Sequence, residues 1–183
     1  MMELGDGNLV VLETQRITLR PYTENDFDDY CSYILDRDLQ YMLGLNDVYD
    51  RESARQNFDW LLLNREFLAI GLKETGRVVG HLCFHPTYEK LQGREEYRDK
   101  VGKSLSFAIA KPYQRNGLMS EALSTVIEQF RTEQKTDFID MEYLSENIGS
   151  SKLKDRFGFR VVGTEDLGFA KLIICVLSMD KTE

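Results

Sequence analysis

One stretch of this sequence, residues 105–130, has the pattern of a strand, a tight turn and a helix in direct succession. The run Leu105-Ser106-Phe107-Ala108-Ile109-Ala110 is apolar and bounded by Pro112, which is typical of a strand. After a polar turn, apolar residues recur at helical spacing at Ala122, Leu123, Val126, Ile127 and Phe130. A strand followed this closely by an amphipathic helix predicts a protein of the α/β (α+β) class, with helices packed on a sheet.

The turn of this unit, residues 114–120, has the features of an anion-binding site. The first turn of a helix leaves backbone N–H groups without partners at the positive end of the helix dipole. Gly117 allows a phosphate to come close to that backbone, and Arg115 adds a positive charge. The plain alternative is a surface turn with a solvated arginine. The turn lacks the first two glycines of a dinucleotide site and the Lys-Ser/Thr end of a P-loop, which disfavours both of those functions.

Hydrophobic periodicity predicts the remaining elements in the order βααβββαβαββ. Thr23 with Asp26 resembles a capping box, Asp50 is a plausible N-cap, and Gly158 fits a left-handed helix end. The turn Glu74-Thr75-Gly76 predicts a hairpin between its flanking strands, and residues 86–102 are predicted to form an exposed loop. The other strands are expected at 16–20, 67–72, 78–84, 138–144, 159–162 and 170–179. The other helices are expected at 27–35, from after Asp50 to near Arg65, and at 148–157.

Length and composition limit the range of functions. With 183 residues and 42% hydrophobic residues, the chain is expected to form one domain over 1–183, with its core at 12–180. A formal net charge of −8 disfavours nucleic acid as a partner, because phosphate backbones bind clustered Lys and Arg. Cys31, Cys83 and Cys175 are odd in number and lie in apolar runs, which indicates buried thiols in a reducing, cytoplasmic setting. Met1–Asn8 lacks a signal-peptide pattern, so no membrane association is expected.

Three separated motifs resemble the GNAT superfamily of N-acetyltransferases. Gln114-x-x-Gly117-x-Met119 is similar to its pyrophosphate loop, Gln/Arg-x-x-Gly-x-Gly/Ala, with Met119 where a small residue is usual. The segment from Asn147 to Phe159 keeps the spacing of the family's Asn-x-x-Ser segment that ends in Gly-Phe. Residues 13–21 resemble the opening strand of the branch that includes ribosomal-protein N-terminal acetyltransferases. The resemblance spans roughly residues 12–180.

The resemblance implies a fold and a co-substrate. The fold is a mixed, mostly antiparallel central sheet of about seven strands with four helices, in which the strands at 105–110 and 138–144 splay apart. The pantetheine arm of acetyl-CoA is expected between those strands, and no metal is expected. The residues expected to contact acetyl-CoA are Phe107, Ala108, Ile109, Ala110, Gln114, Arg115, Asn116, Gly117, Leu118, Met119, Ser120, Asn147 and Lys154.

The resemblance also implies direct attack of a neutral amine on the thioester. A backbone N–H near Ile109 is the expected oxyanion donor. Lys154 occupies the position at which many members carry a Tyr that protonates the thiolate, and Lys suits that role poorly. Ser150 is the expected proton donor, because the branch that includes the ribosomal-protein acetyltransferases places a Ser there. The alternative for Ser150 is a hydroxyl that bonds the helix backbone.

The general base is harder to assign, because Ser104 stands where members of this branch often have a Glu. Asp140 and Glu142 on the strand at 138–144 are the candidate carboxylates, acting directly or through water. Surface-facing acids are the commoner explanation for such residues. His81 and His85 share a strand face by alternation, but this alone does not indicate a site.

The sequence leaves several questions open. The acceptor is an amine carried by a peptide or by a small molecule, and the loop at 86–102 is expected to border its site. The loss of the Glu and the Tyr also allows a catalytically silent acyl-CoA-binding or sensing module with the same fold. The oligomeric state is left between monomer and homodimer.

Overall fold

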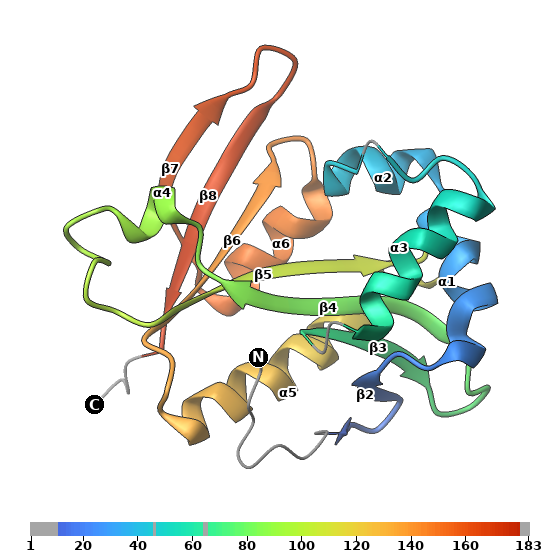
Figure 1. Ribbon diagram of the computed structural model, residues 1–183. Helices are drawn as coiled ribbons and strands as arrows, with labels where there is room; N and C mark the ends of the chain where they lie inside the picture. Colours follow the sequence, from blue (N-terminus) through green and yellow to red (C-terminus); the bar gives the residue numbers. More distant parts are fainter. Residues whose placement is uncertain (1–10, 46, 64–65, 180–183) are drawn as a thin grey trace. The chain divides into compact units, whose positions relative to one another are not determined.

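The computed structural model describes residues 11–45, 47–63 and 66–179. The chain forms two compact units, and each unit is built from two separate stretches of sequence. Figure 1 labels the helices and strands along the chain. The first unit combines Met1–Cys83 with Phe107–Thr125, and the second combines Phe84–Ser106 with Val126–Glu183. The single domain expected over 1–183 stays a prediction.

The first unit contains an antiparallel set of strands. β1 (Leu12–Glu13) pairs with β2 (Ile17–Pro21), β2 with β3 (Phe67–Leu72), and β3 with β4 (Val78–Pro86). Alternation explains the burial of β2, because its apolar side chains face one side and are fully buried at Ile17 and Leu19. The predicted hairpin between β3 and β4 is confirmed, and Gly76 in its turn has a left-handed φ of 73°.

Helices of the first unit bury their apolar faces in one hydrophobic cluster with these strands. The short 3-10 helix η1 (Glu24–Asp26) leads into α1 (Phe27–Ile34), followed by α2 (Arg37–Leu43) and α3 (Arg51–Leu63). The caps expected at Thr23 and Asp50 are confirmed: the Thr23 N–H donates to Asp26 at 2.7 Å, and the Ser53 N–H donates to Asp50 at 2.8 Å. α2 was not predicted from the sequence.

Three elements run through both units: β4, which passes to the second unit after Cys83, β5 and α5. β5 (Gly102–Ile109) belongs to the second unit up to Ser106 and to the first unit from Phe107. The 3-10 helix η2 (Lys111–Tyr113) follows it, and α5 (Leu118–Glu133) passes from the first unit to the second after Thr125. The strand, turn and helix predicted for residues 105–130 are therefore confirmed, with a strand that begins three residues earlier than expected, at Gly102 instead of Leu105.

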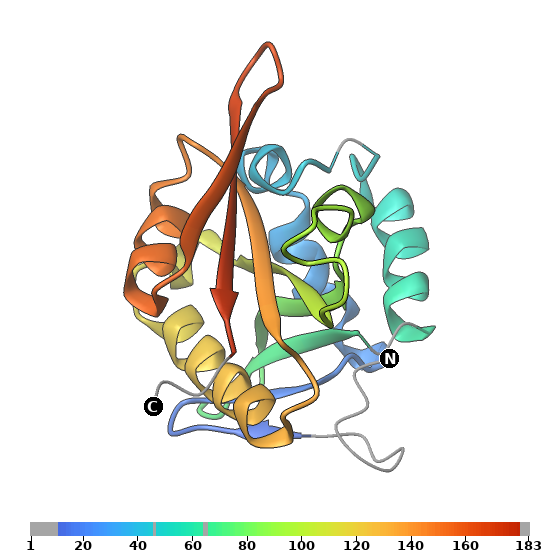
Figure 2. The same ribbon diagram turned by 90° about the vertical axis from the view of Figure 1, so that its left-hand side faces the viewer.

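The second unit contains β6 (Phe138–Leu144), α6 (Ile148–Phe157), β7 (Arg160–Asp166), β8 (Lys171–Ser178) and the short α4 (Glu89–Gln92). β8 pairs antiparallel with both β6 and β7. α6 lies alongside β6 and β8 (Figure 2). Gly158 ends α6 with a φ of 78°, as its predicted role requires. β5 pairs parallel with β6 over three residue pairs, the last of which is Ser104 with Asp140.

The hydrogen-bonded strand order is β1-β2-β3-β4-β5-β6-β8-β7, a mixed and mostly antiparallel sheet of eight strands. The predicted class is confirmed, and the short pairing of β5 with β6 agrees with the expected splay. The structure adds β1, α2 and α4 to the predicted elements. The expected turn at Asn46, the helix end near Arg65 and the N-terminal segment Met1–Asn8 lie outside the described residues. No helix within the described ranges is long and apolar enough to cross a bilayer.

Candidate active site

The turn between η2 and α5 has the backbone shape expected of an anion site. Arg115 and Gly117 both adopt left-handed conformations, with φ of 62° and 78°. Alternating right- and left-handed residues form a concave nest of N–H groups, and the first N–H groups of α5 extend it. Residues 114–117 are exposed, so an anion can reach this nest from solvent. Within the first unit, the turn and the end of β5 therefore bring together the expected contact residues from Phe107 to Ser120.

Two side chains fix the turn in this shape. Gln114 donates from Nε2 to the carbonyl of Ile109 at 3.0 Å, which ties the turn to the end of β5. Arg16 donates from Nη1 to the carbonyl of Asn116 at 2.9 Å and from Nε to Glu121 at 2.6 Å. Burial works to raise the pKa of Glu121, but hydrogen bonds from Thr14 and Arg16 outweigh it and hold the pKa below its ordinary value. Gln114 and Arg16 thus hold the turn in place by donating to backbone carbonyl groups.

Met119 does not cover the exposed part of the turn. Its side chain is buried, as is that of Leu118, while Asn116 and Gly117 face solvent. The thioether therefore packs into the unit at the position where the family usually has a small residue.

The last residues of β5 lie against β4 without room for side chains between them. A Cβ added to Gly80 would come within 2.1 Å of the Ala108 carbonyl oxygen, so this position requires glycine. The Ala110 N–H donates to the Val79 carbonyl at 2.8 Å. This close approach fixes the backbone around Ile109, where the oxyanion donor is expected.

In the second unit, the start of α6 presents Asn147 and Ser150. Asn147 is the N-cap, and its Oδ1 accepts the Ser150 N–H at 3.0 Å. Asn147 keeps its amide donors for another partner. Ser150 is buried, and within the described part of the chain its hydroxyl makes no hydrogen bond. The alternative role, a hydroxyl bonded to the helix backbone, is absent there.

Lys154 lies one turn further along α6. Its ammonium pairs with Asp155 at 2.5 Å, and its side chain is only 17% exposed. The hydrogen bond with Asp155 raises the pKa of Lys154, so it stays charged. This charge is directed at Asp155.

Asp140 on β6 is a buried carboxylate held by two hydroxyl groups. Thr87 donates to its Oδ1 at 2.7 Å, and Ser104 donates to its Oδ2 at 2.5 Å. Burial raises the pKa of the Asp140 carboxyl, while these two hydrogen bonds and the nearby His85 act in the opposite direction. Glu142, two residues along the same strand, is exposed. The two candidate carboxylates therefore lie in very different surroundings.

The two histidines differ as well. His81 is buried in the first unit, where its Nδ1 lies 3.0 Å from the Tyr33 hydroxyl. Burial lowers the pKa of His81 to about 4, so the ring is neutral at pH 7. His85 in the second unit lies 3.1 Å from the Pro86 carbonyl and 3.4 Å from the Tyr88 hydroxyl.

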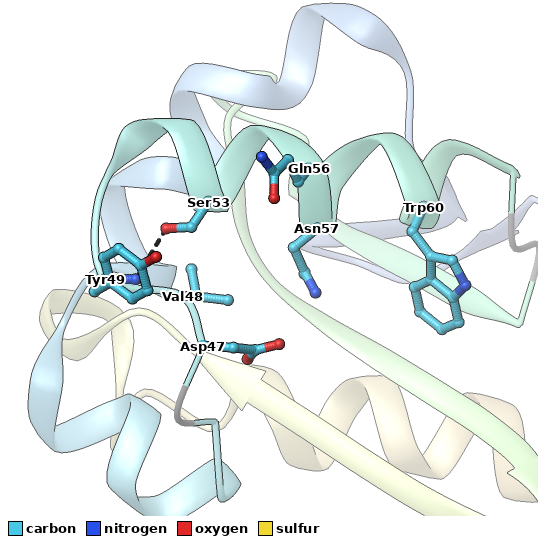
Figure 3. Close-up of a pocket in the computed structure, with 7 residues that line it drawn as sticks. All are labelled: Asp47, Val48, Tyr49, Ser53, Gln56, Asn57 and Trp60. Carbon is cyan, nitrogen blue, oxygen red and sulfur yellow. Dashed lines mark hydrogen bonds between the residues drawn. The ribbon is translucent and has the colours of Figure 1, made fainter.

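The first unit also contains a surface hollow of about 420 Å³, which the sequence did not predict (Figure 3). Asn57 lies at its centre, with its Oδ1 held by the Tyr30 hydroxyl and its amide nitrogen directed toward Asp47. Tyr49 and Trp60 are 62% and 51% exposed at its ends. Val48 packs in the same core cluster as Ala108 of β5 and Ala110, which follows that strand. The lining residues are Asp47, Val48, Tyr49, Ser53, Gln56, Asn57 and Trp60.

Comparison with known proteins identifies the family. The sequence profile of the acetyltransferase (GNAT) domain matches residues 16–160. The chain belongs to the GNAT acetyltransferase family. It is similar to the N-acetyltransferase YoaA of Bacillus subtilis (strain 168), with 23% identity over 158 residues that cover 84% of each chain.

Solved structures share the GNAT fold over almost the whole chain. A GNAT acetyltransferase from Bacillus anthracis has a TM-score of 0.76 at 17% identity, covering 93% of this chain and 99% of its own. A ribosomal-protein-S5-alanine acetyltransferase from Vibrio fischeri has a TM-score of 0.74 at 15% identity, covering 95% of this chain and 99% of its own. The predicted fold, with structural neighbours among ribosomal-protein acetyltransferases, is confirmed.

Family membership makes the chain an acyl-transferring enzyme, as predicted from the three motifs. Sequence reasoning found the GNAT turn and the α6 segment, but it missed the Arg16–Glu121 link and the partners of Asp140. A signal for the latter was present, because Ser104 had already been singled out as the place of a missing carboxylate. Its pairing with Asp140 became visible only with the register of β5 and β6.

Proposed function

We propose that this enzyme transfers the acetyl group of acetyl-CoA to a primary amine by direct attack. The observation that carries the proposal is the exposed nest of N–H groups at 114–120, which fits a pyrophosphate. Its shape comes from two left-handed residues, and the N–H groups of residues 115–117 bond to no described residue. Acyl transfer is the activity of the family, and the proposal adds an amine as the acceptor.

We assign binding of acetyl-CoA and the steps of acetyl transfer to separate groups of residues. The turn at 114–120 holds the phosphates, and the amide of Asn147 holds the pantetheine. A backbone N–H near Ile109 stabilises the oxyanion formed when the amine attacks the thioester carbonyl. Ser150 then donates a proton to the departing thiolate. Its buried hydroxyl, which bonds to no described residue, supports this role.

The hollow in the first unit supports an amine acceptor. The exposed carboxylate of Asp47 attracts an ammonium group before it loses its proton, as does the net charge of the chain. The rings of Tyr49 and Trp60 can cover an apolar group or a cation. The amide groups of Gln56 and Asn57 suit a peptide backbone, so a peptide N-terminus fits better than a bare amine. We place the reaction in the cytoplasm, where the three buried cysteines remain thiols.

Binding of CoA is tested by a substitution in the nest. Gly117→Asp places a carboxylate where the phosphates are proposed to bind, and acetyl-CoA affinity measured by calorimetry should fall by at least tenfold. Gly76→Asp is the matched control, because Gly76 has a similar φ of 73° and lies in the β3–β4 turn. Equal affinities of the two variants and the parent would show that CoA binds elsewhere.

Transfer is tested with acetyl-CoA and two acceptors, an Ala-Ala-Ala peptide and spermidine, by following thiol release. Acetylation of the peptide is expected, with an increase in KM for Trp60→Ala. Tight CoA binding without turnover on either amine would count against amine acetylation and favour the silent module.

A further inference from the structure

Asp140 is a buried acid that has no cation as a hydrogen-bonding partner. It is 1% exposed, and both of its oxygens accept from neutral hydroxyl groups, those of Thr87 and Ser104. Buried carboxylates are normally paired with a positive charge, because desolvation of an ion is costly. Such an arrangement therefore calls for an explanation other than stability.

The surroundings of Asp140 come from four elements of the second unit. Ser104 is its partner on β5, Val176 is its partner on β8, and Glu142 follows it on the same face of β6. His85 and Thr87 face it from the end of β4 and the segment after it. Of these groups, His85 is the one that can carry a positive charge, and it bonds to neither carboxylate oxygen.

The position of the pair in the sheet matters as well. Ser104 and Asp140 form the last pair of the β5–β6 ladder, and beyond them no register joins these two strands in the described structure. Residues at the end of a ladder can turn to a ligand without breaking a backbone pair. A hydroxyl and a carboxylate in hydrogen-bond contact at that point form a path for one proton.

We infer that Asp140 is the proton acceptor of the acetyl transfer and that the Ser104 hydroxyl passes the proton to it. The inference rests on the proposed amine acetylation. Glu142 is exposed, and His81 is bonded to Tyr33 in the other unit, so neither shares the arrangement of Asp140.

The proton balance of this step is complete. The amine nitrogen forms a bond to the carbonyl carbon, the C–S bond breaks, and the thiolate receives a proton from Ser150. The nitrogen loses one proton to the Ser104 oxygen through a chain of waters, while the Ser104 proton moves to Oδ2 of Asp140. Asp140 then releases its proton to water, and Ser150 takes up a proton from water, before the next cycle. Burial raises the pKa of this carboxyl above its ordinary value, and this direction suits a general base.

The experiment compares Asp140→Asn with the parent, using acetyl-CoA and the Ala-Ala-Ala peptide across pH 5 to 9. Asn keeps the size of the side chain and can still bond both hydroxyls, so the fold should persist. kcat at neutral pH should fall by roughly a hundred- to ten-thousandfold. The ratio of parent to variant kcat should shrink as the pH falls through the pKa of Asp140, because the parent then carries a protonated acid. A purely structural Asp140 gives a ratio that does not change with pH.

Controls separate this inference from the proposed function. Asp137→Asn, at an exposed carboxylate that accepts the Val101 N–H at 2.7 Å, should leave kcat unchanged. An unchanged kcat in Asp140→Asn, or the pH-dependent loss appearing in Glu142→Gln instead, overturns the role of Asp140 while amine acetylation stands. A parent protein that binds acetyl-CoA but acetylates neither test amine overturns both.

Discussion

The buried polar groups of the two units are treated differently. In the first unit, Asp26 accepts two bonds from Arg20, at 2.7 and 2.8 Å, and His81 is a neutral ring next to Tyr33. In the second unit, Asp140 accepts from the uncharged hydroxyl groups of Thr87 and Ser104, and the Ser150 hydroxyl bonds to no described residue. The buried carboxylate of the first unit is neutralised by an arginine. The buried carboxylate and hydroxyl of the second unit have no such partner among the described residues and can exchange protons.

The pKa directions of the two aspartates show the same contrast. Burial works to raise the pKa of both. In Asp26 the bonds from Arg20 and Thr23 outweigh burial, and the net pKa is lowered. In Asp140 burial outweighs the bonds from Ser104 and Thr87, and the pKa is raised. A carboxylate fixed by a cation stabilises the fold, whereas one with a raised pKa is better suited to take up a proton.

Ser150→Ala tests whether the buried polar groups of the second unit take part in catalysis, and it has the largest expected effect. Loss of a general acid should lower kcat by about a hundred- to ten-thousandfold and leave CoA affinity nearly intact. The melting temperature should hardly change, since no described partner of the hydroxyl is lost. Ser151→Ala, one residue along the helix, should behave as the parent. A lower melting temperature with kcat per folded molecule unchanged would make Ser150 structural.

Asp26→Asn tests whether the ion pair with Arg20 in the first unit stabilises the fold. Removing the charge leaves Arg20 without its carboxylate, so the free energy of unfolding should fall by about 2–4 kcal/mol in denaturant titrations. kcat per folded molecule should not change. Asp28→Asn is the control, because the Asp28–Arg51 pair is exposed and should contribute under about 1 kcal/mol. Similar losses of unfolding free energy in both variants would mean that the Asp26–Arg20 pair stabilises the fold no more than an exposed ion pair does.

His81 gives the smallest expected effect, visible as a pH dependence. The unfolded chain binds a proton near pH 6.5, whereas burial lowers the folded pKa to about 4. Acidification through this window therefore favours the unfolded chain, by about 2 kcal/mol between pH 6.5 and pH 5. The parent should lose this much more stability than His81→Gln over that range. Equal losses would show that His81 can be protonated in the fold.

Local patterns in the sequence were enough for most of the fold. β6 and α6 have the predicted bounds, because each combines a clear periodicity with a recognisable end. α2 was missed although Asp36 caps its start and Gly44 ends it, since its apolar residues are few and lie in a segment that looked like a loop. The first residues of β5, Gly102 to Ser104, are strand because they pair with β6, and no local signal shows this.

The candidate site was predictable to the same extent. The turn at 114–120 and the Asn147–Ser150 cap are local and were found from spacing. The Arg16–Glu121 contact joins residues 105 positions apart, and the Thr87–Asp140 bond joins residues 53 apart. Pairs this distant depend on strand register and packing, so one sequence without its structure could not show that Asp140 has two hydroxyl partners.

The way the chain alternates between units constrains how this enzyme can be altered or inherited. The path passes from one unit to the other after Cys83, Ser106 and Thr125, and these points lie inside β4, β5 and α5. No single cut in the gene separates one unit from the other, and a single recombination event between two relatives would join segments of different origin within at least one unit. Exchange of a whole unit needs three crossovers, so the phosphate-binding turn and the proton-transferring residues are expected to descend together.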